Sequence, residues 1–290
     1  KRCSLTFKRY KVMKNLQFNP YILLFGTLLL ILNSCGNKTD NTTAHQCDSL
    51  KYNIIAISDS IKDATGSTII VNANVALPLN ESEDKDISSV YNKYLLNLKN
   101  DSITGENAVI TYVKKILDFY KTPAENIPPE LEDETEKVSK YEINHNITPI
   151  FNSCNIFCVM KNTNMKKDGN STIETNNYFS FNTSNCSRIN IMDIIKDEYS
   201  TDINNLLKER LMQQEGVTNQ SQLIDLGYFN IDNLSINNNF FFKDNKIVFA
   251  YEPYEIACLQ VGEVCIALEI DELTPYIKEN SILSKLNAND

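Results

Sequence analysis

The chain has 290 residues, with 28 Lys and Arg against 37 Asp and Glu, and a formal net charge of −9. Residues 1–34 hold six basic and no acidic residues, so the rest of the chain carries a net charge of about −15. A chain this acidic repels nucleic acid and anionic lipid headgroups, and we expect no nucleic-acid partner. The roughly 255 remaining residues suffice for one large domain or two small ones.

An apolar run precedes Cys35. It is the twelve-residue segment from Tyr21 to Leu32, and the basic Lys14 precedes it. A helix that spans a bilayer needs roughly twenty residues. A short apolar run with a basic flank and a small residue before a cut site is typical of an export signal. Leu32-Asn33-Ser34-Cys35 resembles the lipobox of bacterial lipoproteins. This pattern predicts a signal peptide and upstream residues over 1–34 and lipidation at Cys35. An uncut signal anchor is the alternative.

Residues 35–47 are polar and small, which predicts a lipidated tether. An acidic run directly after the lipidated cysteine resembles the surface-export signal of Bacteroidetes lipoproteins. No such run follows Cys35. We therefore expect a cell-envelope protein attached to the membrane through the lipid on Cys35. The periplasmic face of the outer membrane is favoured over the cell surface.

Six cysteines remain after Cys35. An even number in an exported protein favours disulfides, with buried thiols as the alternative. Cys154 and Cys158 would lie roughly 13 Å apart on one strand, too far to bond each other. Cys186, on a following strand, is the nearest candidate partner for either one. The disulfide candidates are Cys47, Cys154, Cys158, Cys186, Cys258 and Cys265.

The first half of the chain combines strands with helices. Residues 51–58 and 68–77 are rich in β-branched residues, and the second segment alternates apolar and polar side chains. Apolar residues three and four apart predict a helix over 87–98 and another over 105–120. The proline-rich and then charged residues 122–140 predict a connection.

The second half begins with predicted strands at 146–160 and 176–182, joined across a Lys-Asp-Gly turn region. A helix is predicted over 201–214, and Gly216 is expected to end it. Lys-Asp-Asn-Lys in the middle of 240–251 predicts a β-hairpin.

A last strand at 263–270 leads into a C-terminal helix. Strands, two helices, strands, one helix and strands again is an α+β order rather than a doubly wound one. We predict two small α/β subdomains with antiparallel sheets, each packed with helices. The first covers 48–125 and the second 146–290, with 126–145 as the connection.

Three segments follow the motif order of a small exported bacterial domain. Residues 182–197 (NTSNCSRINIMDIIKD) resemble its opening motif, and 240–256 (FFFKDNKIVFAYEPYEI) resemble its hairpin followed by Pro-Tyr-Glu-Ile-Ala. Residues 262–273 (GEVCIALEIDEL) resemble its closing strand and helix. This is the RsiV/PdaC-type domain of unknown function, found in a lysozyme-sensing anti-sigma factor and in a peptidoglycan deacetylase. Residues 48–125 resemble the smaller PdaC-like N-terminal domain that commonly precedes it.

The chain departs from the family pattern at three places. Residues 163–174 lack the Gly-Gly-Ala-His turn that members often carry. Cys258 stands where a proline usually follows Tyr-Glu-Ile-Ala, and Cys186 stands where the opening motif has glycine. We expect the fold to tolerate these changes, whereas a function that depends on the missing turn is not expected.

Catalytic motifs are absent from the sequence. There is no nucleophile elbow, no glycine-rich phosphate loop and no histidine pair at metal-ligand spacing. His45 lies in the predicted tether and His145 at the start of a strand, so neither fits a catalytic dyad. The metal site of the related deacetylases, one Asp and two His, cannot be built from these residues. We therefore expect no enzyme, no metal and no cofactor.

Tyr254 and Glu255 are the residues that we single out for possible binding. In the functional interpretation, they present a polar contact on an irregular segment. In the structural interpretation, which we favour, Glu255 caps a turn beside a packed Tyr254.

Two functions remain open. The first is a lipid-anchored binding or sensing module whose ligand is an envelope glycan or a protein such as lysozyme. The alternative is a cell-wall-active hydrolase with an unrecognised carboxylate site. A deep cleft with two carboxyl groups about 5–9 Å apart would favour the hydrolase, and a shallow face would favour binding.

Overall fold

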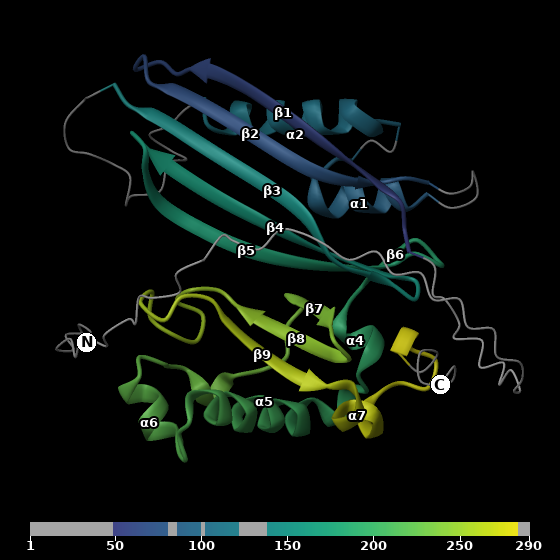
Figure 1. The fold of residues 1–290 in the computed structure, drawn as a ribbon. Coiled ribbons are helices and arrows are strands. Elements are labelled where there is room, and N and C mark those ends of the chain that lie inside the picture. Colours follow the sequence, from purple (N-terminus) through teal and green to yellow (C-terminus); the bar gives the residue numbers. More distant parts are fainter. Residues whose placement is uncertain (1–48, 81–85, 100–101, 122–137, 284–290) are drawn as a thin grey trace, which may run out of the picture. The chain divides into compact units, whose positions relative to one another are not determined.

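The structure is a computed structural model that describes four stretches of the chain. These are residues 49–80, 86–99, 102–121 and 138–283, without the side chains of 171–173. The predicted signal peptide, the lipidation site Cys35 and the tether with Cys47 lie outside the described residues. Within them the chain is mixed α+β, with a six-stranded and a three-stranded sheet packed with helices (Figure 1). This confirms the predicted fold class.

The larger sheet has the strand order β1-β2-β3-β4-β5-β6. β2 and β3 pair in parallel, and every other pair of neighbours is antiparallel. The strands are β1 (Tyr52–Lys62), β2 (Thr68–Pro78), β3 (Lys140–Ser153), β4 (Ile156–Lys167), β5 (Asn170–Asn182) and β6 (Ser187–Ile189). Strands from both predicted subdomains therefore share one sheet.

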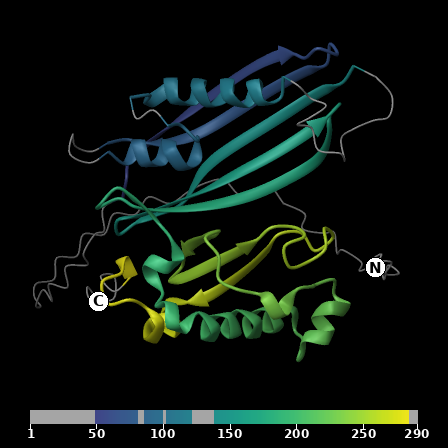
Figure 2. The same ribbon diagram turned by 180° about the vertical axis from the view of Figure 1, so that it is seen from behind.

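Two helices connect β2 to β3, because parallel neighbours cannot be joined by a tight turn. They are α1 (Ile87–Leu95) and α2 (Gly105–Phe119), close to the two predicted helices. Both lie on the same face of the six-stranded sheet (Figures 1 and 2). Their apolar residues form a core there with alternate residues of β2, which are Ile69, Val71, Ala73, Val75 and Leu77.

The single strand predicted over 146–160 is wrong, because the segment contains a hairpin. β3 ends at Ser153 and β4 begins at Ile156. Cys154 and Asn155 form the two-residue turn, with φ of 51° and 63°. Positive φ at both positions is the type I′ geometry, whose twist matches that of the paired strands.

The smaller sheet consists of β7 (Phe240–Lys243), β8 (Lys246–Tyr251) and β9 (Val264–Glu269), all antiparallel. The predicted hairpin between β7 and β8 is confirmed. Its turn residues, Asp244 and Asn245, have φ of 46° and 58°.

The long helix α5 (Ser200–Glu215) packs against the smaller sheet through Ile203, Leu207 and Leu211. It ends as predicted at Gly216, whose φ of 66° is left-handed. The shorter elements are α4 (Ile191–Ile194), α6 (Gln220–Asp225), α7 (Ile270–Leu273) and the 3-10 turns Asp197–Tyr199, Ile231–Asn233 and Thr274–Tyr276. Among the described helices, none is both long and apolar enough to cross a membrane.

The two sheets share a core. It combines Ile156 and Cys158 of β4 with buried side chains of β7, β8, β9 and α5. Tyr178 of β5 also stacks on Phe241 of β7, with ring centroids 4.5 Å apart. The chain passes from one sheet to the other after β6, and not at the predicted connection 126–145.

The predicted disulfide of Cys186 with Cys154 or Cys158 is wrong. Within the described residues, no disulfide forms among Cys158, Cys186, Cys258 and Cys265. Cys158 points into the core between the sheets, where its Sγ lies 3.2 Å from Ser180 Oγ. Cys186 packs instead against the core under α1 and α2, so the two thiols lie on opposite faces. Burial raises the pKa of the Cys158 thiol to about 11.

The hydrogen bonds of Leu50, near the start of the described residues, indicate a different disulfide. The Leu50 N–H donates to Asn152 Oδ1, and Asn152 Nδ2 donates to the Leu50 carbonyl, each over 2.8 Å. Three residues of chain reach at most about 11 Å, so Cys47 can approach Cys154 closely enough for the Cα separation of roughly 4.4–6.8 Å in a disulfide. We expect a Cys47–Cys154 disulfide.

Peptide mapping of the unreduced protein should recover the two cysteines in one cross-linked fragment. Cys154→Ser should make Cys47 available to alkylation without reductant, whereas Cys258→Ser should not. Full alkylation of Cys154 in the unreduced wild type would contradict the bridge.

Candidate functional site

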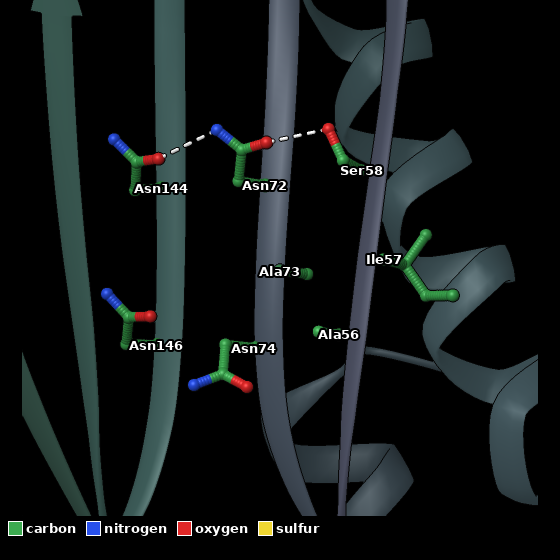
Figure 3. Close-up of a pocket in the computed structure, with 8 residues that line it drawn as sticks. All are labelled: Ala56, Ile57, Ser58, Asn72, Ala73, Asn74, Asn144 and Asn146. Atoms are coloured by element: carbon green, nitrogen blue, oxygen red, sulfur yellow. Dashed lines mark hydrogen bonds between the residues drawn. The ribbon is translucent and has the colours of Figure 1, made fainter.

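Asparagine side chains project from the six-stranded sheet on the face opposite α1 and α2. Asn72 and Asn74 of β2 alternate with buried aliphatic residues. Asn144 and Asn146 of β3 alternate with the buried Ile143 and Ile147 and the half-buried His145. Because successive residues of a strand point to opposite faces, all four amides lie on the side away from the helices. Figure 3 shows them, with the helices behind the strands. We call these four residues the amide face.

The amide face borders a cavity of about 300 Å³, which Ala56, Ile57, Ser58 and Ala73 also line. Ser58 Oγ donates to Asn72 Oδ1 over 2.7 Å, and Asn72 Nδ2 donates to Asn144 Oδ1 over 2.9 Å. In contrast, Asn74 and Asn146 form no side-chain hydrogen bond with any described residue (Figure 3). Their donors and acceptors are therefore available to a ligand.

The strand register extends the amides into two rows across the sheet. The first row is Ser58, Asn72, Asn144 and Asn164; the second is Asn74, Asn146, Asn162 and Asn176. In the second row, Asn162 Nδ2 donates to Asn176 Oδ1 over 2.8 Å. Asn176 Nδ2 in turn donates to Glu263 Oε2 over 3.0 Å. The row thus ends on a carboxylate next to β9.

Tyr254 and Glu255, the predicted binding pair, have different surroundings. Glu255 Oε2 accepts the Glu252 N–H over 3.0 Å and caps the turn, as in the structural interpretation. Tyr254 is 65% exposed with φ of 70°, so its expected packing is wrong. Glu255 also lines a second cavity of about 310 Å³, together with Glu252 and Arg188.

Sequence reasoning missed the amide face, although a signal for it was present. Asparagine occurs at positions i and i+2 in both Asn72/Asn74 and Asn144/Asn146. Asparagine is depleted in strands, so two such pairs in β-rich segments indicate a polar sheet face. Arg188 gave no comparable signal, because its neighbours come from distant parts of the chain.

His145 of β3 is half-buried and contacts Tyr112 of α2. Tyr112 Oη lies 2.5 Å from His145 Nδ1, and burial raises the pKa of this tyrosine, so the hydroxyl donates and the imidazole accepts. Burial, followed by the charge of Lys161, lowers the pKa of His145 to about 4. The ring is therefore a neutral structural acceptor. Within the described residues, no group of His, Cys, Asp and Glu is arranged to hold a metal ion.

The lowered pKa of His145 predicts a pH-dependent stability. The unfolded chain, with an ordinary histidine pKa near 6.5, binds more protons than the folded chain between about pH 6.5 and pH 4. Stability is therefore fully present above pH 6.5 and falls as the pH drops towards 4, by up to about 3 kcal/mol.

Urea unfolding across this pH range measures the effect. His145→Gln, which keeps an acceptor for Tyr112, should remove this part of the slope, whereas His45→Gln should retain it. An unchanged slope in His145→Gln would show that other groups cause the acid sensitivity.

Comparison with known proteins finds one family model that matches part of the second half of the chain. Residues 192–271 match the family model described as "Protein of unknown function (DUF3298)". These residues run from α4 through β9 and include α5 and the hairpin. The chain therefore carries a DUF3298 domain. No curated protein matches the chain.

Two solved structures have a similar fold. One is a crystal structure of a DUF3298 family member from Bacteroides fragilis NCTC 9343. It has a TM-score of 0.67 and 18% identity, covering 84% of this chain and 99% of that one. The other is a DUF3298 family protein from Pseudomonas aeruginosa PAO1, with a TM-score of 0.51 and 10% identity, covering 80% of this chain and 96% of that one. At these identities the likeness shows the fold alone.

Proposed function

We propose that this protein is a lipid-anchored module of the cell envelope that binds an envelope glycan through the amide face. The observation that carries the proposal is the pair of amides, Asn74 and Asn146, which form no side-chain hydrogen bond with a described residue and lie on the sheet face opposite α1 and α2. The signal-peptide pattern before Cys35 and the resemblance to RsiV/PdaC-type exported domains support the envelope setting.

The chemistry of the amide face suits a neutral, hydroxylated ligand. Each amide side chain offers two donors and an acceptor oxygen, and a sugar hydroxyl both donates and accepts. The residues that line this cavity carry no formal charge. The desolvation free energy of a neutral sugar in this cavity is therefore smaller than that of an ionic group. The sugar exchanges its hydrogen bonds to water for hydrogen bonds to the amides.

A lysozyme-like protein is the other ligand that the family resemblance suggests. Such a cationic protein would be attracted by the net charge of about −15 on the residues after 34, which is 22 basic minus 37 acidic residues. Specific recognition of it would need carboxylates across the contact, and the cavity at the amide face has none. A glycan therefore fits this face better than a cationic protein.

Hydrolysis is the alternative function, and Glu252 and Glu255 are the acids that line one cavity. Both carboxylates already accept hydrogen bonds within the fold. Asn177 Nδ2 donates to Glu252, and the Glu252 N–H donates to Glu255. These bonds give both acids a structural role, which favours binding over turnover.

The double variant Asn74→Ala/Asn146→Ala should bind peptidoglycan fragments and chitooligosaccharides at least tenfold more weakly than the wild type. Loss of two net hydrogen bonds of about 1 kcal/mol each would account for this. Isothermal titration calorimetry measures the affinity. Asn107→Ala, at an exposed position of α2, is the matched control and should bind like the wild type.

Three outcomes would overturn the proposal. In the first, the double variant retains wild-type glycan affinity. In the second, lysozyme binds and glycans do not. In the third, the wild type degrades peptidoglycan and Glu255→Gln abolishes that turnover, which would establish the hydrolase instead.

Lipidation at Cys35 is a separate prediction. Metabolic labelling with an alkyne fatty acid should mark the wild type in the membrane fraction, and Cys35→Ala should lose the label. Cys3→Ala should keep it, because Cys3 precedes the predicted signal peptide. Equal labelling of the wild type and Cys35→Ala would contradict the lipobox interpretation.

A further inference from the structure

Arg188 of β6 contacts two aromatic rings. Its guanidinium carbon lies 5.2 Å from the ring centroid of Tyr94 and 5.1 Å from that of Phe179. Contact with two aromatic rings restricts the orientation of a planar guanidinium. The rings come from α1 and β5, so the position of this cation depends on the packing of the helix against the sheet.

The guanidinium has no polar partner within the described residues. Its Nε atom is buried without a hydrogen bond, and none of the described acidic residues forms a salt bridge with it. A buried unsatisfied donor costs about 1–3 kcal/mol, and more when it is charged. Arginine is the side chain that binds carboxylates in two-point geometry. Arg188 is therefore oriented for an anionic group that none of the described residues supplies.

Arg188 lines the second cavity, of about 310 Å³, with Phe179 and Asn177 of β5. The cavity lies where β6 ends beside β5, because β6 pairs only with Ser180 to Asn182. Its volume is at the lower end of the range for small-molecule sites. A ligand of a few residues matches this size.

Two carboxylates line the same cavity. One oxygen of Glu252 accepts from Asn177 Nδ2, and one oxygen of Glu255 accepts the Glu252 N–H. The second oxygen of each has no partner among the described residues. The cavity therefore combines an unpaired cation with two carboxylates that retain free acceptor oxygens. A purely anionic ligand would be repelled by the carboxylates, and a purely cationic ligand by Arg188.

Neutral amides that line the same cavity are held by the fold. Asn239 Oδ1 accepts the Tyr178 N–H over 2.7 Å, and Asn238 Oδ1 accepts the Ile191 N–H over 2.9 Å. Asn238 Nδ2 has no acceptor among the described residues and lines the cavity. It is a fixed donor, and a peptide carbonyl is the corresponding acceptor.

We propose that the cavity around Arg188 binds a short zwitterionic peptide, with the peptide carboxylate on Arg188 and its ammonium group on Glu252 and Glu255. Asn238 donates to a carbonyl of the same peptide. This site is distinct from the amide face, and it does not depend on glycan binding there.

Calorimetry with alanine tripeptides of both chiralities tests the site. The free tripeptide should bind the wild type, whereas its C-terminal amide and its N-acetyl form should each bind at least tenfold more weakly. Arg188→Met keeps an unbranched stem beside the rings. It should lower the affinity for the free tripeptide at least tenfold and leave the affinity for the amide form unchanged. Arg188→Lys should recover only part of the affinity, because lysine lacks the two-point geometry.

Glu255→Gln should lower the affinity for the free tripeptide and leave the affinity for the N-acetyl form unchanged. Circular dichroism melting confirms that each variant is folded. Failure of both chiral forms to bind the folded wild type at millimolar concentration would overturn the proposal, and so would equal affinity for the free, amidated and acetylated peptides. Neither result would bear on glycan binding, which Asn74 and Asn146 test separately.

Discussion

The parallel pairing of β2 with β3 is the constraint on which the rest of the structure depends. It joins the β1–β2 hairpin to β3–β6 in one sheet, and it forces α1 and α2 into the crossover between the two strands. The helices then occupy one face of the sheet, where Val71, Val75 and Ile143 are buried under them. With that face covered, the intervening residues must lie on the other face. The amide face is therefore a direct consequence of this one pairing.

The same pairing determines how far the sequence could be interpreted without a structure. Local patterns predicted the helices before residue 120, α5 with its terminal Gly216, and the β7–β8 hairpin, because periodicity and turn residues are properties of neighbouring residues. The β2–β3 register joins Asn72 to Asn144 across 72 residues, and no local pattern contains it. The composition of 126–145 predicts a connection between two subdomains. The six-stranded sheet instead includes strands from both sides of that connection.

The remaining errors also have physical causes. The hairpin at Cys154-Asn155 lacks the glycine that usually marks a type I′ turn, so a continuous apolar segment resembled one strand. Cys186 has a left-handed φ of 52°. That conformation belongs to a turn after β5, which sends the thiol to the helix-covered core and away from Cys158. Sequence separation alone could not reveal the face on which each cysteine lies.

Both candidate surfaces are defined by polar groups that have no partner among the described residues. Asn72 donates to Asn144, and Asn162 donates to Asn176, which shows that neighbouring amides on this sheet can pair. Asn74 and Asn146 are neighbours in register and do not pair. Arg188 likewise lies near two glutamates without forming an ion pair.

Residues that oppose a local preference without a compensating contact are expected at functional sites, where a ligand supplies the missing partner. Stability alone would favour β-branched side chains at positions 74 and 146, and a paired or apolar residue at position 188. The unsatisfied groups are therefore better explained by binding than by folding. They also differ in kind, since the amides are neutral and the group at position 188 is charged. For this reason the two surfaces require ligands of different chemistry.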